Sequence, residues 1–363
     1  MKPKKPTRRA MLAKEVLDRL TNGTYPPGER FPTCDELMRE FSVSRSTVQQ
    51  VLRKLSQDGF VVTDGRRGTR VTSHPPHLHK FALVFPVTTG RTNRFWTALK
   101  EVAAAASNAT DVQWDFYFDV DRHVDNPAYQ QLTRDITSMK IAGLVLVADP
   151  YLSAETPDFG EFDIPKVRLL HATTPDLPLI DTDTDSFISL SIERLRTRGC
   201  RRIAVAHQPL VEPMERFKEE ILRSGMETHD RWLQMVALEH PEIATRIMQL
   251  LFSAAPETRP DGLIIADDNL MEYVLSGVLS AGVNIPVDVQ VVAHCNWPQV
   301  LPCAVPVDRL GYDVRDFLTQ ASATLRAMRR NETPPVVHYI PATFEPDGSR
   351  QRLEAVIQNG NLA

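Results

Sequence analysis

Cysteine is scarce in this sequence, and no long apolar segment is present. The spacing of its four cysteines in 363 residues fits neither a disulfide framework nor a metal site with paired thiolates, and we interpret them as reduced thiols: Cys34, Cys200, Cys295 and Cys303. No run approaches the roughly 18 apolar residues that a membrane helix requires. The basic start, MKPKKPTRR, is not followed by the apolar stretch of a signal peptide. These absences predict a cytoplasmic protein with no membrane partner.

The sequence also lacks the short motifs that mark common catalytic and nucleotide-binding sites. It contains no G-x-S-x-G, no G-x-x-x-x-G-K-[ST], no G-x-G-x-x-G and no H-E-x-x-H. An enzyme with this sequence would have to use a constellation that none of these motifs describes. We therefore predict that the protein is not an enzyme and needs no cofactor.

Residues 33–59 carry the most informative local pattern, which predicts two short helices joined by a tight turn. Thr33 and Glu36 have the spacing of a capping box, in which each side chain accepts a hydrogen bond from the backbone N–H of the other residue. Ser44 is a second N-cap, and Gly59 ends the helix that follows it. One side of that second helix is apolar, with Val48, Val51, Leu52 and Leu55.

The opposite side of the second helix is polar and suits contact with DNA. Arginine suits guanine or phosphate, glutamine suits adenine, and short hydroxyls near a helix N-terminus reach phosphate oxygens. A merely solvated amphipathic helix is the alternative. The hairpin pattern at 60–72, with a glycine-rich and doubly basic tip, favours DNA, because such a wing can lie on the minor groove or the phosphates. The predicted DNA-binding residues are Thr33, Ser44, Arg45, Ser46, Thr47, Gln49, Gln50, Arg53, Arg66, Arg67 and Gly68.

Charge divides the chain into two unlike parts. Residues 1–80 hold 16 Lys and Arg against 8 Asp and Glu, a balance of +8. The remaining 26 basic and 38 acidic residues give −12, for a total of −4. A basic first module on an acidic body is expected of a DNA-binding head, because neutralised phosphates supply most of the non-specific affinity.

The head also has a family resemblance. The segments PGERFP, EL, VSRSTV and the hairpin GRRGTRV resemble, nearly position for position, the winged helix-turn-helix of GntR-type transcription regulators. The resemblance covers residues 1–72 and implies sequence-specific binding to double-stranded DNA. Asp35 stands where that family commonly has an arginine that meets DNA, Cys34 stands where Glu is usual, and Gln49 replaces a frequent arginine. We therefore expect an operator that differs from the commonest one.

Residues 73–80, SHPPHLHK, predict a linker, because two prolines interrupt a polar stretch. Its three histidines have no carboxylate or cysteine nearby, and we predict no metal site. The D-x-D-x-D spacing at 181–185 is similar to a calcium loop, but Ser186 stands where that loop needs glycine and Ile192 where it needs glutamate. We interpret these aspartates as strand-end residues at a cleft.

From residue 81 onwards short apolar runs alternate with amphipathic segments. Continuous apolar runs are typical of parallel strands that are buried on both faces, and the segments between them predict connecting helices. Residues 81–348 therefore predict a doubly wound α/β domain, and residues 349–363 a C-terminal tail. Ligands of such sheets bind at the carboxyl ends of the strands. The predicted helices cover about residues 95–107, 126–139, 185–198, 213–224, 241–254 and 268–281.

This second domain resembles the effector domain of LacI-type regulators. The landmarks are NRFW at 93–96, AGLVLVA at 142–148, GCRRIA at 199–204 and IPVDVQVV at 285–292. The resemblance implies a periplasmic-binding-protein-like fold of two lobes with a ligand cleft between them. The sugar-binding arginine of that family falls on Pro213, its effector-binding aspartate falls on Cys295, and an asparagine has become Asp267. A simple sugar effector is therefore not implied, because the groups that clamp vicinal hydroxyls are missing.

Aromatic and polar residues nevertheless remain at the expected cleft. An aromatic face with a few polar groups suits a carbohydrate or a polyol, although ordinary packing or loop solvation also accounts for each residue by itself. The predicted effector-binding residues are Phe95, Trp96, Asp149, His171, Asp183, Asp267, His294 and Asn296.

These observations predict a homodimeric transcription regulator, a repressor, that is controlled by a small-molecule, carbohydrate-like effector. Two alternatives stay open. In one, a DNA-binding dimer has a body that has lost effector sensing. The other is a solute-binding protein, against which the attached winged helix and the absent signal peptide argue.

Overall fold

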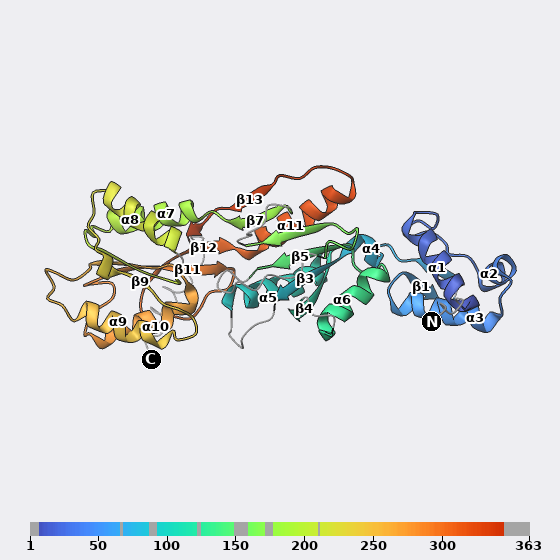
Figure 1. Ribbon diagram of the computed structural model, residues 1–363, viewed down its shortest axis with the longest axis horizontal. Helices are drawn as coiled ribbons and strands as arrows, with labels where there is room; N and C mark the ends of the chain where they lie inside the picture. Colours follow the sequence, from blue (N-terminus) through green and yellow to red (C-terminus); the bar gives the residue numbers. More distant parts are fainter. Residues whose placement is uncertain are drawn as a thin grey trace, which may run out of the picture.

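The computed structural model of the chain describes residues 7–65, 68–86, 93–121, 125–148, 159–170, 177–209 and 211–344. Figure 1 shows three parts in a row: a small helical head, a first α/β lobe next to it, and a second α/β lobe at the far end. Arg66, Arg67, Asp149 and His171, four of the predicted site residues, lie outside the described residues, as does the predicted tail at 349–363.

The head consists of three helices and a two-stranded hairpin. The helices are α1 (Arg8–Thr21), α2 (Cys34–Phe41) and α3 (Arg45–Gln57), and the hairpin pairs β1 (Val61–Asp64) with β2 (Gly68–Val71). The two strands are antiparallel, with Val61 opposite Val71. The head has a core of its own, built from Leu12, Val16, Leu20, Phe31, Leu37, Val48, Val51, Leu55 and Phe60. The predicted winged helix-turn-helix architecture is confirmed.

The segment between head and body was predicted as a linker without helix or strand, and this expectation is wrong in part. Residues 76–79 form a helical turn, α4 (Pro76–His79), and β3 already starts at Lys80. Proline at the first helical position lacks only an N–H that would have no intrahelical partner there, so Pro76 starts the turn instead of preventing it.

The linker also docks the head on the first lobe. The ring of His77 is only 5% exposed and stacks on Phe60 of the head, with ring centroids 5.8 Å apart and an interplanar angle of 14°. The Nζ of Lys140, from the first lobe, lies 2.8 Å from Oδ1 of Asp58 in the head. We call Asp58, Phe60, His77 and Lys140 the head–body joint.

The first lobe is a fully parallel sheet covered on both faces. Its strands are β3 (Lys80–Pro86), β4 (Gln113–Val120), β5 (Gly143–Val147), β6 (Lys166–Leu169), β7 (Leu179–Thr182) and β13 (Val337–Ile340), in the order β13-β7-β6-β5-β3-β4. Alternate residues of β3 face opposite ways: Phe81 and Leu83 pack with α5 (Arg94–Ala109) and α11 (Val314–Arg329), whereas Ala82 packs with α6 (Pro127–Thr137).

The second lobe has the same architecture. Its strands are β8 (Ile203–His207), β9 (Leu233–Met235), β10 (Gly262–Ile265), β11 (Gln290–Trp297), β12 (Asp308–Asp313) and β14 (Thr343–Phe344), in the order β14-β12-β11-β10-β8-β9. All neighbouring pairs are parallel except β12 and β14. One face is covered by α7 (Thr184–Thr197) and α8 (Val211–Arg223), the other by α9 (Glu242–Phe252) and α10 (Met271–Ser280).

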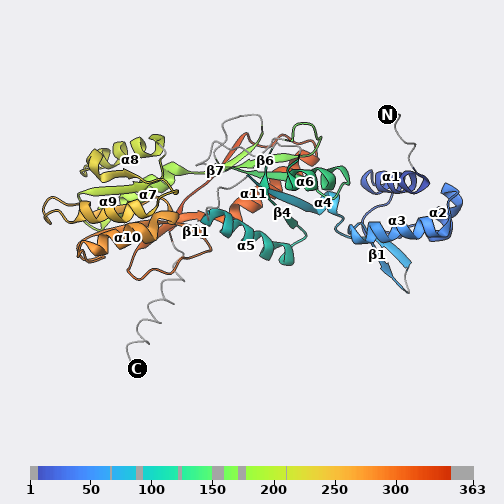
Figure 2. The same ribbon diagram turned by 60° about the horizontal axis from the view of Figure 1, so that its bottom comes forward.

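The chain passes between the lobes at three points, after β7, after β12 and after β13. Hydrogen bonds tie the passages after β7 and β13 together: the N–H of Asp183 donates to the carbonyl of Ile340 at 2.8 Å, and the N–H of Ala342 donates to Oγ of Ser186 at 2.8 Å. Figure 2 shows the crossing region between the two lobes from a second side. The predicted doubly wound, two-lobed body is confirmed, and the carboxyl ends of both sheets face the space between the lobes. Among the described residues, no helix is both long and apolar enough to cross a membrane.

Candidate functional site

The start of α2 has the predicted capping box. The N–H of Glu36 donates to Oγ1 of Thr33 at 3.3 Å, and Oε2 of Glu36 accepts from the N–H of Thr33 at 2.7 Å. The N–H and the hydroxyl of Thr33 both bind the carboxylate, and they hold the pKa of Glu36 below its ordinary value. Thr33 therefore fixes the start of α2, which lies directly before the turn into α3.

Ser44 fixes the start of α3 in the same way. Its Oγ accepts from the N–H of Thr47 at 3.3 Å and lies 2.9 Å from the hydroxyl of Ser46. Val48, Val51 and Leu55 are buried in the head, so α3 turns its other side to solvent. The exposed predicted contacts on that side are Arg45, Ser46, Gln49, Gln50 and Arg53, while Gly68 is exposed at the start of the second wing strand.

Arg45 already has a partner in the free protein. Its Nη2 lies 2.6 Å from Oδ1 of Asp35. The two side chains are more than half exposed, 59% for Arg45 and 61% for Asp35. A cation and an anion thus lie together at the N-terminal ends of α2 and α3.

Between the lobes lies a small cavity of about 110 Å³ at the carboxyl ends of the strands. Four of the predicted effector-binding residues line it, namely Phe95, Asp267, His294 and Asn296. The other lining residues are Leu170, Thr182, Thr184, Phe187, His207, Pro213, Phe217, Ala266 and Tyr312. Aromatic rings therefore occupy much of the wall, and Pro213 lines the cavity at the place of the absent arginine.

Two other predicted residues lie elsewhere. Trp96 is buried against Phe85 of β3, with ring centroids 5.3 Å apart, and does not line the small cavity. Asp183 caps α7, because its Oδ1 accepts from the N–H of Ser186 at 3.1 Å. Neighbouring residues of a helix point about 100° apart, and here Phe95 faces the small cavity while Trp96 turns to Phe85.

A buried polar network forms the wall of the small cavity in the second lobe. Oδ1 of Asp267 accepts from the N–H and the side-chain amide of Asn269, at 2.7 and 2.9 Å, and the side-chain amide of Gln208 donates to the other carboxylate oxygen. The side-chain amide of Asn296 donates to Oδ2 of Asp268 at 2.8 Å. Both carboxylates are thus desolvated and held in place by amides.

His294 is the titratable group of this network. Its Nδ1 lies 3.6 Å from Oδ1 of Asp268, which is too long for a hydrogen bond but close enough for an electrostatic attraction. Burial by itself lowers the pKa of His294, but the carboxylate of Asp268, with Asp267 behind it, outweighs burial and raises the pKa above its ordinary value. The two carboxylates therefore favour the protonated form of this imidazole.

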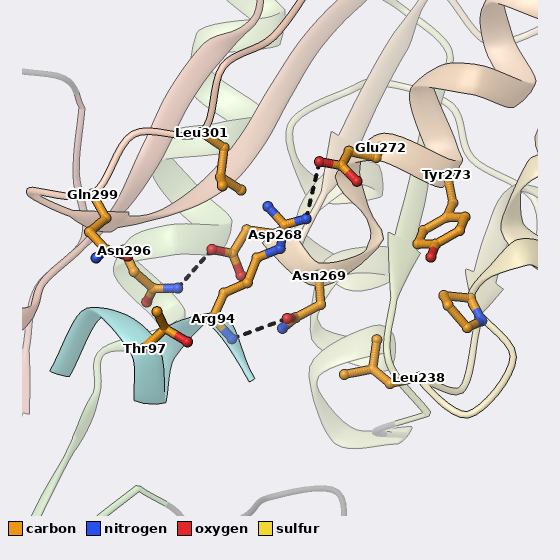
Figure 3. A pocket seen from close by; sticks show the side chains of 11 residues that line it. Arg94, Thr97, Leu238, Asp268, Asn269, Glu272, Tyr273, Asn296, Gln299 and Leu301 are labelled. Carbon is orange, nitrogen blue, oxygen red and sulfur yellow. Dashed lines mark hydrogen bonds and ion pairs between the residues drawn. The ribbon is translucent and has the colours of Figure 1, made fainter. Parts of the chain in front are cut away.

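A larger cavity of about 560 Å³ adjoins the small one, and Asn296 lines both. Figure 3 shows Arg94, from α5 of the first lobe, reaching between Asp268 and Glu272 of the second lobe. Nη2 of Arg94 lies 3.3 Å from Oε1 of Glu272, and its backbone N–H donates to Oδ1 of Asn269 at 3.2 Å. Its buried Nη1 has no hydrogen-bond partner among the described residues. The other lining residues are Thr97, Leu238, Pro241, Tyr273, Gln299 and Leu301.

Sequence reasoning missed Arg94, Asn269, Glu272 and Gln299 as cavity residues. Arg94 stood inside the landmark NRFW, next to the predicted residues Phe95 and Trp96, so a local signal was present there. Glu272 lies at the start of α10, beyond the end of β10. The rule that ligands bind at the carboxyl ends of strands therefore does not predict it.

Comparisons with known proteins agree with both parts of the structure. The sequence model of the gntR family of bacterial regulatory proteins matches residues 8–71, and that of the periplasmic binding protein-like domain matches residues 192–346. The arabinose metabolism transcriptional repressor of Geobacillus stearothermophilus is 22% identical over 357 residues, which cover 90% of this chain and 93% of that protein. The histidine utilization repressor of Pseudomonas putida is 36% identical over 62 residues, 17% of this chain and 25% of that protein.

Solved structures share the fold at low sequence identity. A regulatory protein of the LacI family from Chloroflexus aggregans has a TM-score of 0.61 at 16% identity and covers 73% of this chain and 96% of its own. The complex of the transcriptional regulator CelR with cellobiose has a TM-score of 0.58 at 18% identity and covers 94% of this chain and 99% of its own.

The resemblances predicted for head and body are confirmed by these matches. The helix α3, exposed on one side, belongs to a head that is joined to a two-lobed body with cavities at the carboxyl ends of its strands. The chain is a DNA-binding transcription regulator that combines a head of the gntR family of bacterial regulatory proteins with a periplasmic binding protein-like body.

Proposed function

We propose that the protein is a homodimeric transcription repressor of the cytoplasm, and that its operator affinity is controlled by a carbohydrate-like effector held between the two lobes. The observation that carries the proposal is the connection of a reading helix to cavities between two lobes through the head–body joint. We propose the domain division 1–72, 73–80 and 81–348, in which residues 73–80 are a docked joint. No catalytic role is part of the proposal.

The exposed side of α3 suits entry into the major groove of DNA. Arg45, Gln49 and Arg53 project from successive turns of that side, while the hydroxyls of Ser46 and Thr47 lie at the N-terminal end where phosphates bind. Two heads related by two-fold symmetry would read half-sites of a pseudo-palindrome about one helical turn or more apart. The wing residues Arg66 and Arg67 stay predicted phosphate or minor-groove contacts.

Arg45→Ala should weaken operator binding by about 1–3 kcal/mol, because a bidentate contact with a base or a strong phosphate contact is lost. Gln49→Ala should relax the choice of base at one position of the half-site. Fluorescence anisotropy with operator variants measures both effects. If both variants keep the affinity and the base preference of the wild type, neither residue contacts DNA.

The sizes of the two cavities decide where an effector fits. Ligand sites of proteins are typically about 300–1,000 Å³. The larger cavity, at about 560 Å³, lies in this range, whereas the small one, at about 110 Å³, lies below it. We infer that the effector fills the larger cavity and extends into the small one past Asn296. The amides and hydroxyls around both cavities suit a neutral, polyhydroxylated ligand, and the cellobiose bound to CelR is of this chemical class.

Free hexoses should shift the thermal midpoint by no more than about 1 °C, because Pro213 and Cys295 replace the groups that clamp vicinal hydroxyls and the small cavity, at about 110 Å³, has little room for one. A carbohydrate that fills the larger cavity should stabilise the body by about 2.7 kcal/mol at roughly 100 times its Kd, which means several degrees. Differential scanning fluorimetry with monosaccharides and disaccharides makes the measurement. A shift of several degrees with a common hexose would contradict the cavity assignment.

Effector binding changes DNA affinity only if the ligand prefers one arrangement of the lobes. Side chains bridge the lobes in this structure: Arg94 contacts Glu272, and the amide of Gln299 donates to Glu101. A ligand in the larger cavity would compete with or reinforce the Arg94 contact. The first lobe also carries the joint, so a change in lobe closure alters how the two heads of a dimer are spaced.

Selection from randomised duplex DNA at two salt concentrations tests the proposed function as a whole. The full-length protein should recover a two-fold-symmetric site, whose occupancy changes when a carbohydrate pool is added. Weak binding without sequence preference that disappears at the higher salt would overturn the proposal. A symmetric site that no pool affects would favour the alternative of a DNA-binding dimer that has lost effector sensing.

A further inference from the structure

The ion pair between Asp35 and Arg45 lies on the surface that reads DNA. Asp35 is the second residue of α2 and Arg45 is the first residue of α3, so the pair joins the N-terminal ends of both helices. Nη2 of Arg45 lies 2.6 Å from Oδ1 of Asp35, and both side chains are more than half exposed. The short distance and the exposure together require an explanation.

Stability does not explain the pair. An ion pair between two exposed side chains contributes little to folding, because solvent screens it and both side chains lose rotamer freedom. Non-specific affinity for DNA does not explain it either, since a carboxylate next to the duplex repels phosphates and cancels the charge of an arginine that would otherwise attract them. Asp35 therefore costs affinity for DNA of any sequence.

A held arginine reads a base better than a free one does. The Nη2 of a guanidinium carries two hydrogens, so one can stay on Asp35 while the other, together with Nη1, faces the N7 and O6 of guanine. The carboxylate also fixes the plane of the guanidinium before DNA arrives, which lowers the ordering cost of the contact. The carboxylate also disfavours a contact of Arg45 with a phosphate, because Asp35 would then lie next to that phosphate and repel it.

We propose that Asp35 is a specificity-determining residue, which holds the Arg45 guanidinium for one guanine of the half-site and lowers its use as a phosphate contact. The inference rests on the proposed entry of α3 into the major groove. It assigns a role to the residue at which this head departs from the arginine of similar proteins, and it accounts for that departure by base choice and not by lost binding.

Asp35→Ala in the full-length protein tests the inference. The probes are the duplex obtained by selection from randomised DNA, the same duplex with the guanine that Arg45→Ala identifies replaced by adenine, and an unrelated duplex. The ratio of affinities for the guanine and adenine duplexes should fall by about tenfold, while affinity for the unrelated duplex stays the same or rises. Asp18→Ala, which removes an exposed carboxylate from α1, is the matched control and should leave the guanine-to-adenine ratio unchanged.

Asp35→Asn keeps the size of the side chain and one acceptor oxygen. Its ratio of affinities for the guanine and adenine duplexes should fall less than that of Asp35→Ala. Circular dichroism should show that the head stays folded. A ratio that is unchanged in Asp35→Ala, or that rises because Arg45 has been released, would overturn the inference. A wild-type protein without any sequence preference would instead overturn the proposed function itself, so the two failures are distinguishable.

Discussion

Phe317→Ala should lower the free energy of unfolding of the body by about 3–5 kcal/mol, the usual cost of removing a fully buried aromatic ring. Phe317 lies in α11, is 0% exposed and meets Phe95 edge to face, with ring centroids 5.3 Å apart. Phe95 in turn lines the small cavity. The substitution therefore removes apolar contacts from the core of the first lobe and also the support of a cavity wall. Carbohydrate binding should weaken together with stability.

Urea unfolding followed by tryptophan fluorescence measures the loss in the body alone, because all four tryptophans (96, 114, 232 and 297) lie outside the head. Phe118→Ala is the matched control. Phe118 is 42% exposed, although it stacks on Phe85 and Phe116, so its loss should cost only about 1 kcal/mol. Equal losses in the two variants would mean that α11 is not part of the core of the first lobe.

The head could be predicted from sequence almost completely, because its signals are local. The capping box at Thr33, the N-cap at Ser44 and the apolar side of the second helix each depend on residues within one or two helical turns. The partner of Arg45 could not be predicted. Asp35 is ten residues away, and only the angle between α2 and α3 brings the two side chains together.

The sequence predicted the alternation of strands and helices in the body, but not the order of the strands in its two sheets. The predicted helices correspond to α5 to α10, while α11 and the strands β7, β12, β13 and β14 were not predicted. The short edge strands carry little signal, since β14 has two residues and β13 has four, of which only Ile340 is buried. The amphipathic spacing of α11 was present in the sequence, and its return to the first lobe, where it packs beside α5, was not.

The cavity residues show the same limit. Asp267, His294 and Asn296 follow or end buried strands, where the strand-end rule places ligand contacts. Arg94 and Glu272 lie on helices of different lobes, and they face one another only because the lobes meet in this arrangement. A local sequence pattern does not show how two lobes are arranged, so the larger cavity could be found only from the structure.

Acidification should loosen the head–body joint, because His77 is held uncharged there. Burial, the positive charge of Arg329 and the neighbouring His79 lower the pKa of His77 from 6.5 to about 4. Between pH 6.5 and 4 the unfolded chain takes up a proton at this position and the folded chain does not, so acid favours the open or unfolded state. The contribution of His77 is fully present above pH 6.5 and is lost as the pH falls towards 4. We expect a total loss of about 2–3 kcal/mol.

His77→Phe separates this effect from other titrations, because phenylalanine keeps the stack on Phe60 and cannot take up a proton. The wild type should lose more stability than His77→Phe between pH 7.5 and 5, measured by urea unfolding with circular dichroism, and small-angle scattering should show a larger radius of gyration where the head undocks. His240→Phe replaces an exposed histidine, and its pH dependence should match that of the wild type. If His77→Phe loses as much stability with acid as the wild type, another group titrates.

The same two proteins, wild type and His77→Phe, also show whether a docked joint or a flexible linker couples the effector site to the operator. Lys140 of the first lobe binds Asp58 of the head, so the joint has an ion pair beside the stack of His77 on Phe60. A docked joint transmits lobe closure to the heads, whereas an open one does not. As the pH falls towards 4, the wild type should therefore lose more of its response to the carbohydrate than His77→Phe does. A response that survives acid in the wild type would show that coupling does not pass through His77.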